Sequence, residues 1–423
     1  MRIKIAKTSE KITRRSGFLI TDEYGKHIRL DELIDKEFGK PKSNRGIKHS
    51  VYVNTVVSMR HDGALHLEDV KHLWEDKAFQ EMLQIKNLPT SDAIGDWLRR
   101  EGANQGEEKI WNVTGQIMKK ISQAEEDVTL DIDTTIIESD KGDSLRTYKG
   151  NYGYNPLIGI IEENGFIAGS EFRQGNVSPA ENLWSFIQKC ENNYGKNIKI
   201  IRIDSAGYQK QIAENCISGN KYFSITAKHT TSVLEAIKSI PEDQWKQGTD
   251  KEGIKTNWEV GETTYTFSAK KKSFRLLAKR ELLKNAELFD DYKYWIVISN
   301  LPLNEYSSND VILFHHRRGL MERVIGELKN QLHLDHMPCG QFEANSLYFT
   351  IGILAYNILQ WIKLTLLPND YKKKSIRTIR YQLLHLAGKL IYHARYTILK
   401  IAAPLKNIQL IESIYLRLRL NPL

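Results

Sequence analysis

The sequence predicts an α/β fold preceded by a mainly helical N-terminal region. Apolar side chains recur at helical spacing within residues 1–120. Two apolar, β-branched runs, 128–135 and 198–204, each carry acidic residues at or near their ends, where an open sheet binds its ligands. A hairpin signal and a helical segment lie between these runs. Strands therefore alternate with helices, as in a layered α/β domain.

Two helices stand out in the N-terminal region. Residues 67–74 and 89–100 both show helical spacing, and the second has a Ser/Thr start signal and a basic end. That basic end, with Arg99 and Arg100, could enter a DNA groove as a recognition helix. Packing against a catalytic core explains such helices equally well.

The first strand, 128–135, carries two acids on one face. Its alternation directs Leu130 and Ile132 to one side and Asp131 and Asp133 to the other. Either acid is a candidate functional group, and a turn or cap role is the alternative for each.

An antiparallel hairpin is predicted next. Residues 156–161 and 165–169 flank a polar turn. A helix should then begin near Ser178, with this residue as its N-cap and Pro179 at its first position.

The second acid-bearing strand, 198–204, ends at Asp204. Gly207 breaks it before a helix through residues 208–216, and a short strand follows at 222–225. Because Asp204 stands at a strand end, we expect it at the ligand-binding edge of the sheet, with an N-cap as the alternative.

Residues 226–291 are too many for one connection and predict a β-rich insertion. Within it, residues 256–267 alternate in strand fashion across a turn centred on Gly261. Lysines 270–272 and the pair 279–280 predict a basic rim, with ordinary solubilising charge as the alternative.

Residues 315–329 carry the most specific functional pattern. On one helix, Arg318, Glu322 and Lys329 would share a face as cation, carboxylate and cation. A carboxylate can hold a divalent metal while the cations bind phosphate oxygens. A solvated surface stripe is the ordinary alternative.

A further apolar stretch, 347–367, is long enough to span a membrane. Asn357, Gln360 and Lys363 interrupt it, so a buried core helix is the better interpretation.

Composition restricts the class of protein. The 423 residues carry a formal net charge of +9, with a pI of about 9.1, which favours a polyanionic partner. Three scattered cysteines argue for a reducing compartment and against a zinc module. The first fifteen residues are basic and lack a secretory signal, so we expect a cytoplasmic protein without a membrane partner.

Three segments together resemble the cut-and-paste DDE transposases of bacterial insertion sequences. Residues 133–135 are similar to the Asp-Ser/Thr-Thr around the first acid of that family, and residues 202–205 to the segment around its second. Arg318, Glu322 and Lys329 match the signature Tyr-x-x-Arg-x-x-x-Glu-x-x-x-x-x-x-Lys around the third.

Two positions qualify this resemblance, which spans roughly residues 45 to 400. His315 stands where the signature has tyrosine, so a strictly tyrosine-specific role does not carry over. A histidine can still donate to a phosphate. The Thr-Thr pair after Asp133 favours that residue over Asp131 as the first acid.

The resemblance implies three groups of functional residues. The catalytic and metal-binding acids would be Asp133, Asp204 and Glu322. The side chains that bind DNA phosphates would be His315, Arg318 and Lys329. The candidates for stacking on a flipped base would be Trp245 and Trp258, although packing is the ordinary role of a tryptophan.

It also implies an RNase H-like core that binds two Mg²⁺ ions about 4 Å apart, with Mn²⁺ as a possible substitute. The expected regions are a helical DNA-end-binding region at 1–120, the first part of the core at 121–225, the β-rich insertion at 226–291, the second part of the core at 292–365, and a basic helical region for dimer or DNA contacts at 366–423.

The implied function is transposition. A homodimer would bind the terminal inverted repeats in double-stranded DNA, cleave the element ends through a hairpin intermediate and join them to target DNA, in association with the nucleoid. The alternatives are an RNase H-like metal-dependent endonuclease without strand transfer, and a non-catalytic DNA-binding protein.

Overall fold

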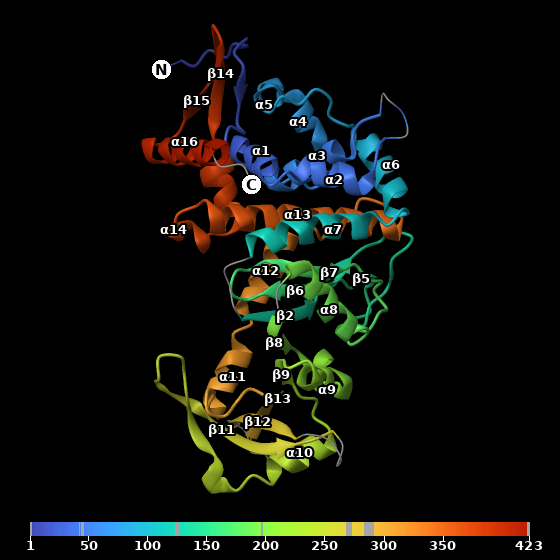
Figure 1. The fold of residues 1–423 in the computed structure, drawn as a ribbon, viewed down its shortest axis with the longest axis vertical. Coiled ribbons are helices and arrows are strands. Elements are labelled where there is room, and N and C mark those ends of the chain that lie inside the picture. Colours follow the sequence, from blue (N-terminus) through green and yellow to red (C-terminus); the bar gives the residue numbers. More distant parts are fainter. Residues whose placement is uncertain are drawn as a thin grey trace. The chain divides into compact units, whose positions relative to one another are not determined.

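The computed structural model describes residues 2–41, 43, 46–122, 127–195, 198–267, 273–282 and 292–420 (Figure 1). The chain forms two compact units. Unit 1 comprises residues 1–121, 136–154 and 325–423, and unit 2 comprises residues 122–135 and 155–324.

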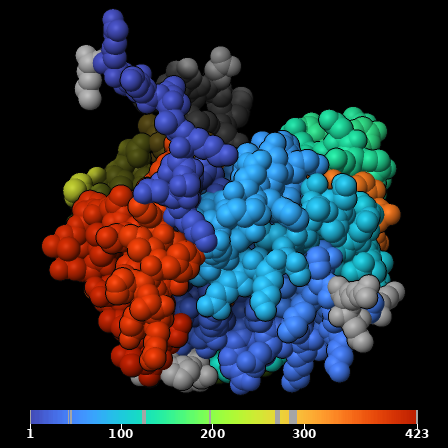
Figure 2. Space-filling view, turned by 90° about the horizontal axis from the view of Figure 1, so that it is seen from above, coloured from blue at the N-terminus to red at the C-terminus, as the bar shows by residue number. Residues whose placement is uncertain are grey.

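Unit 1 consists mainly of helices from both ends of the chain. Its N-terminal helices are α1 (Phe18–His27), α2 (Leu30–Phe38), α3 (His49–Asp62), η1 (Leu67–Val70), α4 (Lys71–Glu75), α5 (Lys77–Met82), α6 (Ser91–Gly102) and α7 (Gly106–Ile121). Its C-terminal helices are α13 (Phe342–Thr365), α14 (Asn369–Lys372), α15 (Ile376–Ile379), η4 (Arg380–Leu384) and α16 (Leu405–Leu420). Figure 2 shows this N-terminal part in blue beside the C-terminal part in red.

The predicted helices at 67–74 and 89–100 are confirmed. The first appears as η1 followed by α4. The second is α6, which begins where expected because the Thr90 hydroxyl accepts a hydrogen bond from the Ala93 amide at 3.2 Å.

Helix α13 forms the centre of unit 1. It is buried over most of its length and packs against α3, α6 and α7. In the part of the chain that the structure describes, it is the one helix long and apolar enough to cross a membrane. Of its most apolar stretch of 18 residues, 94% is buried. The prediction of a buried core helix at 347–367 is therefore confirmed.

Two small sheets complete unit 1. Strands β1 (Ile12–Thr13), β14 (Ala387–His393) and β15 (Tyr396–Ala402) form an antiparallel sheet in the order β1–β14–β15. The other sheet has the order β3–β5–β4, with β3 at Ile137–Glu138, β4 at Leu145–Arg146 and β5 at Tyr152–Tyr154. The C-terminal region is thus not all helical, because a hairpin separates η4 from α16.

Unit 2 is organised around one mixed sheet. Among its described residues, nine strands follow the order β10–β11–β12–β13–β9–β8–β2–β6–β7. Their bounds are β2 (Val128–Thr134), β6 (Leu157–Ile161), β7 (Ile167–Glu171), β8 (Ile198–Ile203), β9 (Tyr222–Thr226), β10 (Lys246–Thr249), β11 (Lys255–Tyr265), β12 (Phe274–Leu282) and β13 (Tyr292–Ser299). The helical elements are α8 (Leu183–Tyr194), η2 (Ser205–Gly207), α9 (Lys210–Ser218), α10 (Thr231–Lys238), η3 (Glu242–Gln244) and α11 (Ser308–His316).

The strand directions divide this sheet into two parts. The pairs β7–β6 and β6–β2 are antiparallel, whereas the pairs β2–β8 and β8–β9 are parallel. Strands β13, β12, β11 and β10 then continue the sheet as an antiparallel meander. The strand and hairpin predictions up to residue 226 are confirmed, and the predicted β-rich character of the following segment agrees with this meander.

Two local predictions are wrong. Helix α8 begins at Leu183 rather than near Ser178, because Asn182 adopts a left-handed conformation with φ 51° and blocks an earlier helical turn. Gly261 lies inside the continuous strand β11 instead of at a turn. A Cβ atom at this position would come within 2.9 Å of the Trp245 ring, so the glycine makes room for that side chain.

The segment 315–329 is also not one helix. Helix α11 ends at His316 with Arg317 as its C-cap, and α12 (Gly319–Asn330) begins two residues later. Arg318 therefore precedes the helix that carries Glu322. Helix α12 runs from unit 2 into unit 1, with the division after Val324.

Candidate active site

Two aspartates lie at neighbouring strand ends in unit 2. Strands β2 and β8 are parallel, and Ile132 pairs with Ile203, so Asp133 and Asp204 follow at the same edge of the sheet. The Asp133 carboxylate accepts a hydrogen bond from the Thr134 amide at 2.8 Å. The prediction that both acids stand at one sheet edge therefore agrees with the register.

The local electrostatics leave negative charge at this edge incompletely compensated. Burial raises the pKa of the Asp133 carboxyl above its usual value, the Arg318 cation opposes that rise, and the charge of Asp204 adds to it. A bound cation would relieve this cost, since a nearby positive charge favours the ionised carboxylate.

Arg318 connects the strand edge with the start of α12. Its Nη2 donates to the Ile132 carbonyl at 3.0 Å and lies 3.1 Å from Asp133 Oδ2. Its carbonyl accepts from the Glu322 amide at 3.4 Å. Glu322 stands in the first turn of α12, where the helix N-terminus favours a carboxylate.

A cavity of about 330 Å³ opens beside these groups. Asp133, Arg318 and Glu322 contribute polar groups to its wall. The other lining residues are Thr226, Trp295, Ile296, Val297, His315 and His316. The structure thus brings the first and third predicted acids to one cavity, while Asp204 follows the adjacent strand β8 and does not line it.

His315 is a buried residue of the cavity wall. Its side chain is 4% exposed, and its two ring nitrogens lie 2.9 Å from Ser224 Oγ and 2.8 Å from Thr226 Oγ1. Burial, followed by the nearby Arg318 cation, lowers the pKa of this imidazole to about 3. A neutral ring held between two hydroxyls is suited to positioning α11.

Lys329, the last residue of the signature, lies in unit 1. Its Nζ donates to the Ile136 carbonyl at 2.9 Å, and its side chain is half-buried. In this structure the ammonium therefore has a backbone partner.

A buried arginine connects the strands that carry the candidate acids. Arg202 lies on β8 two residues before Asp204, and its guanidinium donates to the Asp131 carboxylate on β2 at 2.5 and 2.7 Å. It also donates to the carbonyls of Phe314 at 2.5 Å and Arg317 at 3.1 Å, and to the Glu162 carboxylate. Arg202 thus fixes β2, β8 and the junction between α11 and α12 relative to one another.

The two tryptophans considered for base stacking are both largely buried. Trp245 is 9% exposed and packs against Arg280, with its ring 4.2 Å from the guanidinium carbon. Trp258 is 8% exposed and joins the apolar cluster that includes Val260 and Leu277. Packing is the role that this geometry favours for both.

Trp295 is a candidate that sequence reasoning missed. It lies on β13, is half-buried and lines the cavity that contains Asp133 and Glu322. The ammonium groups of Lys279 and Lys293 each lie 4.6 Å from its ring centroid. Its position in an alternating strand shortly before the signature was the available signal.

The predicted basic rim is only partly described. Lysines 270–272 lie outside the described residues. Arg280 forms ion pairs with Glu242 and Glu259, which explains the rise in its pKa. Lys279 contacts Trp258 and Trp295.

The acids fit a divalent cation by their chemistry. Carboxylate oxygens are the ligands that Mg²⁺ prefers, and the raised pKa of Asp133 beside Asp204 indicates a place where a cation is stabilising. Among the described residues, no three His, Cys, Asp or Glu side chains are grouped closely enough to ligate one ion. Asp133 and Glu322, the first and third predicted acids, share the cavity wall.

Comparison with known families identifies the class of protein. Residues 1–422 match the family described as transposase DDE domain group 1. The chain therefore belongs to this transposase family, whose members are enzymes that act on DNA. No curated protein sequence matches the chain.

Proposed function

We propose that the protein is a cut-and-paste transposase of a bacterial insertion sequence, with Asp133, Asp204 and Glu322 as its catalytic acids. One observation carries the proposal. Asp133 at the end of β2 and Asp204 directly after the parallel neighbour β8 lie at one sheet edge, and Glu322 lines the same cavity as Asp133. A non-catalytic DNA-binding protein would have no need to gather acids in this way.

The topology of unit 2 supports an RNase H-like core. Its first strands occur in the order β7–β6–β2–β8–β9. Strand β6 is antiparallel to the central strand β2, whereas β8 and β9 run parallel to it. The meander of β10 to β13 extends this sheet as the insertion, and Glu322 on α12 lines the same cavity as Asp133. Unit 1 supplies the helical DNA-end-binding region and the basic C-terminal region.

The three acids would hold two Mg²⁺ ions, for which Mn²⁺ can substitute. These ions would supply activation of the attacking oxygen and neutralisation of charge on the phosphate. The pKa of Asp133, raised by burial, would return toward its usual range as the cations bind.

The side chains around the three acids have different roles. Arg318 exchanges its contact with Asp133 for a bidentate contact with a DNA phosphate, and Lys329 adds a point charge to a second phosphate. His315 stays neutral and holds α11 in place. Trp295 stacks on a base removed from the duplex near the cut.

The reaction then follows from in-line phosphoryl transfer. Hydrolysis frees a 3′-hydroxyl at the element end, and this hydroxyl attacks the opposite strand to form a hairpin or attacks target DNA. A homodimer would hold both inverted repeats, and its place in the cell would be the cytoplasm, associated with the nucleoid.

The test uses a duplex taken from the DNA that borders the gene, so that it includes the element end. With Mg²⁺ and a target plasmid, wild-type protein should cut the end and join it to the plasmid. Asp133→Asn, Asp204→Asn and Glu322→Gln should each abolish cutting and retain binding, whereas the exposed control Glu305→Gln should behave as wild type.

Two outcomes would contradict the proposal. Full cutting by one of the three variants would remove that residue from the site. Cutting by the wild type without any joined product would favour a metal-dependent endonuclease without strand transfer.

A further inference from the structure

The positive charge of the chain is concentrated near its C-terminus. Residues 372–419 contain eleven lysines and arginines and a single acid, Glu412, so their formal charge is +10 against +9 for the whole chain. The remainder of the chain is thus close to neutral. A polyanionic partner of the protein should therefore contact this region first.

A two-stranded hairpin projects from this region. Strands β14 and β15 extend away from the helices of unit 1 (Figure 1). Strand β1 pairs with β14 at Gly388 and Lys389, and the Leu390 amide donates to the Lys11 carbonyl at 2.9 Å, so the ribbon is two-stranded from Ile391 to Ile398.

The two faces of the ribbon differ in their surroundings. Leu390 is 5% exposed, and the Tyr392 hydroxyl donates to Glu81 on α5 although Tyr392 itself is 55% exposed, so the rest of unit 1 covers this face at its base. The opposite face carries Ile391 opposite Ile398 and His393 opposite Tyr396. Its exposed side chains include Tyr396, at 74%, and Ile398, at 43%.

Cations border this open face. Lys389 pairs directly with Lys400 across the strands, a like-charge arrangement that disfavours the hairpin by itself. Glu10 compensates Lys389. Within the described residues, no carboxylate forms an ion pair with Lys400 or with Arg395 at the tip.

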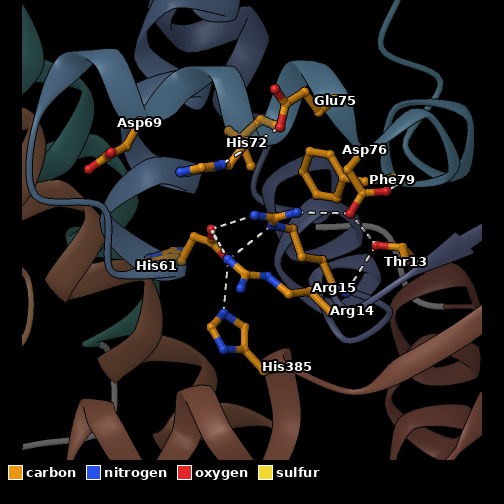
Figure 3. A network of polar contacts seen from close by, with 12 residues as sticks. Thr13, Arg14, Arg15, His61, Asp69, His72, Glu75, Asp76, Phe79 and His385 are labelled. Atoms are coloured by element: carbon orange, nitrogen blue, oxygen red, sulfur yellow. Dashed lines mark hydrogen bonds and ion pairs between the residues drawn. The ribbon is translucent and has the colours of Figure 1, made fainter. Parts of the chain in front are cut away.

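A network of polar contacts surrounds His385, just before the hairpin (Figure 3). His385, just before β14, lies 2.8 Å from Asp62 through Nε2. The same carboxylate accepts from Arg15, which also donates to Asp76 at 2.8 Å. These buried contacts hold the pKa of Asp62 well below its usual range and join α3, the N-terminal strand and the hairpin.

We propose that the open face of hairpin β14–β15 binds in the major groove of duplex DNA and distinguishes the element end from other sequences. The major groove accommodates a two-stranded ribbon. Arg395 and Lys400 would contact phosphates, while Ile398 and Tyr396 would contact base edges, including thymine methyl groups. This inference rests on the proposed function and assigns the reading of the DNA end to a particular surface.

Charge also argues against a second copy of the chain as the occupant. Edge-to-edge pairing of two β15 strands would bring Lys400 and Arg395 of both copies together. Lysine on an edge strand is a common protection against such pairing. Duplex DNA instead complements these cations.

The experiment measures binding of the full-length protein to two duplexes of equal length, the element end and an unrelated sequence, across a series of salt concentrations. The double variant Arg395→Gln/Lys400→Gln should reduce the slope of log affinity against log salt by about two units on both duplexes. Ile398→Ser should leave the slope unchanged and reduce the preference for the element end by about tenfold.

Two control variants test whether the changes in salt slope and in preference for the element end are specific to the hairpin. Lys246→Gln removes an exposed cation of β10 in unit 2, outside the region assigned to DNA-end binding, and should leave the slope as in the wild type. Ala394→Gly changes neither charge nor the open face and should keep wild-type binding, since glycine suits the left-handed conformation of this residue, φ 52°.

Unchanged slope and preference in both hairpin variants would overturn the inference. If wild-type protein nevertheless cuts the element end in Mg²⁺, only the role of the hairpin fails; if it neither binds nor cuts that end, the proposed function fails as well. Loss of dimers on sedimentation, with unchanged DNA binding, would assign the surface to a second copy and also overturn the inference.

Discussion

Arg202 on β8 and Asp131 on β2 form a fully buried ion pair, joined by two hydrogen bonds of 2.5 and 2.7 Å. Arg202 stands two positions before Asp204, which directly follows β8, and Asp131 stands two positions before Asp133 on β2. Side chains two apart in a strand lie on the same face of the sheet. The pair therefore fixes the relative positions of the two strands immediately beside the site.

Removing one member of this pair should destabilise the protein strongly. For Arg202→Met we expect a loss of about 3–5 kcal/mol in the free energy of unfolding, because the Asp131 carboxylate would remain buried without its partner. The measurement is a denaturant titration, with Lys199→Met, at a half-buried position of the same strand, as the control.

The double variant Arg202→Met/Asp131→Leu tests whether the unpaired Asp131 carboxylate causes this loss of stability. It removes both charges and should recover a substantial part of the lost stability. If Arg202→Met costs no more than its Lys199 control, the pair does not hold these strands together.

The same pair shows what the sequence can and cannot predict. Alternation along 128–135 placed Asp131 and Asp133 on one face, and that local pattern was sufficient to find the strand. It could not decide between the two acids, since their difference depends on β8. Asp131 faces Arg202 in the interior, whereas Asp133 lies at the cavity with Arg318.

The other differences between the predictions and the structure also arise from contacts between residues that are distant in sequence. Gly261 has the composition of a turn, but its place inside β11 is decided by the Trp245 ring that packs over it. The predicted helix through 315–329 is interrupted at Arg317, whose carbonyl accepts a hydrogen bond from Arg202. Trp295 reaches the cavity because β13 pairs with β9, a contact between strands that are distant in sequence.

Glu162 should make stability depend on pH. Burial raises the pKa of this carboxyl to about 6, although Arg202 opposes the rise. The folded state thus retains a proton that the unfolded state releases near pH 4.5, so this group stabilises the fold at low pH and the contribution is lost as pH rises from about 4.5 to 6.

The variant Glu162→Gln should remove that loss. Relative to wild type, we expect it to gain up to about 1 kcal/mol between pH 4.5 and 6.5, a value reduced from the full linkage because the carboxylate is partly exposed. Thermal unfolding at a series of pH values measures the difference. A constant difference across this range would mean that Glu162 titrates normally.

His315, unlike Glu162, should lower the stability of the fold as pH decreases. Its pKa is lowered to about 3, so below pH 6.5 the unfolded state takes up a proton that the folded state excludes. The contribution of this residue to stability is complete above about pH 6.5 and falls by about 1.4 kcal/mol per pH unit as pH decreases toward 3.

Replacement by a neutral side chain isolates this contribution. His315→Gln retains hydrogen-bonding groups for Ser224 and Thr226 but cannot take up the proton. We expect it to be less sensitive to acid than wild type, and its profile of DNA cutting between pH 6.5 and 8.5 to keep the wild-type shape. A limb of the activity profile that disappears only in this variant would show that the imidazole titrates during catalysis.

Trp295 should act on the DNA rather than on the fold. A half-buried indole in the cavity wall can accept a base against its face, and such stacking contributes about 1–3 kcal/mol per base. Trp295→Ala should therefore slow cutting of the element end by roughly tenfold to a hundredfold, while Trp295→Phe keeps part of the rate.

A fluorescent base analogue beside the cleavage position provides the direct measurement. Wild-type protein should change its fluorescence as the base leaves the duplex and stacks, and Trp295→Ala should lose that change. The control is Trp258→Phe, which alters a tryptophan packed in the apolar cluster and should reduce stability without affecting the signal. If the signal instead disappears in the Trp258 variant and persists in Trp295→Ala, the base is held by the insertion and not by the cavity wall.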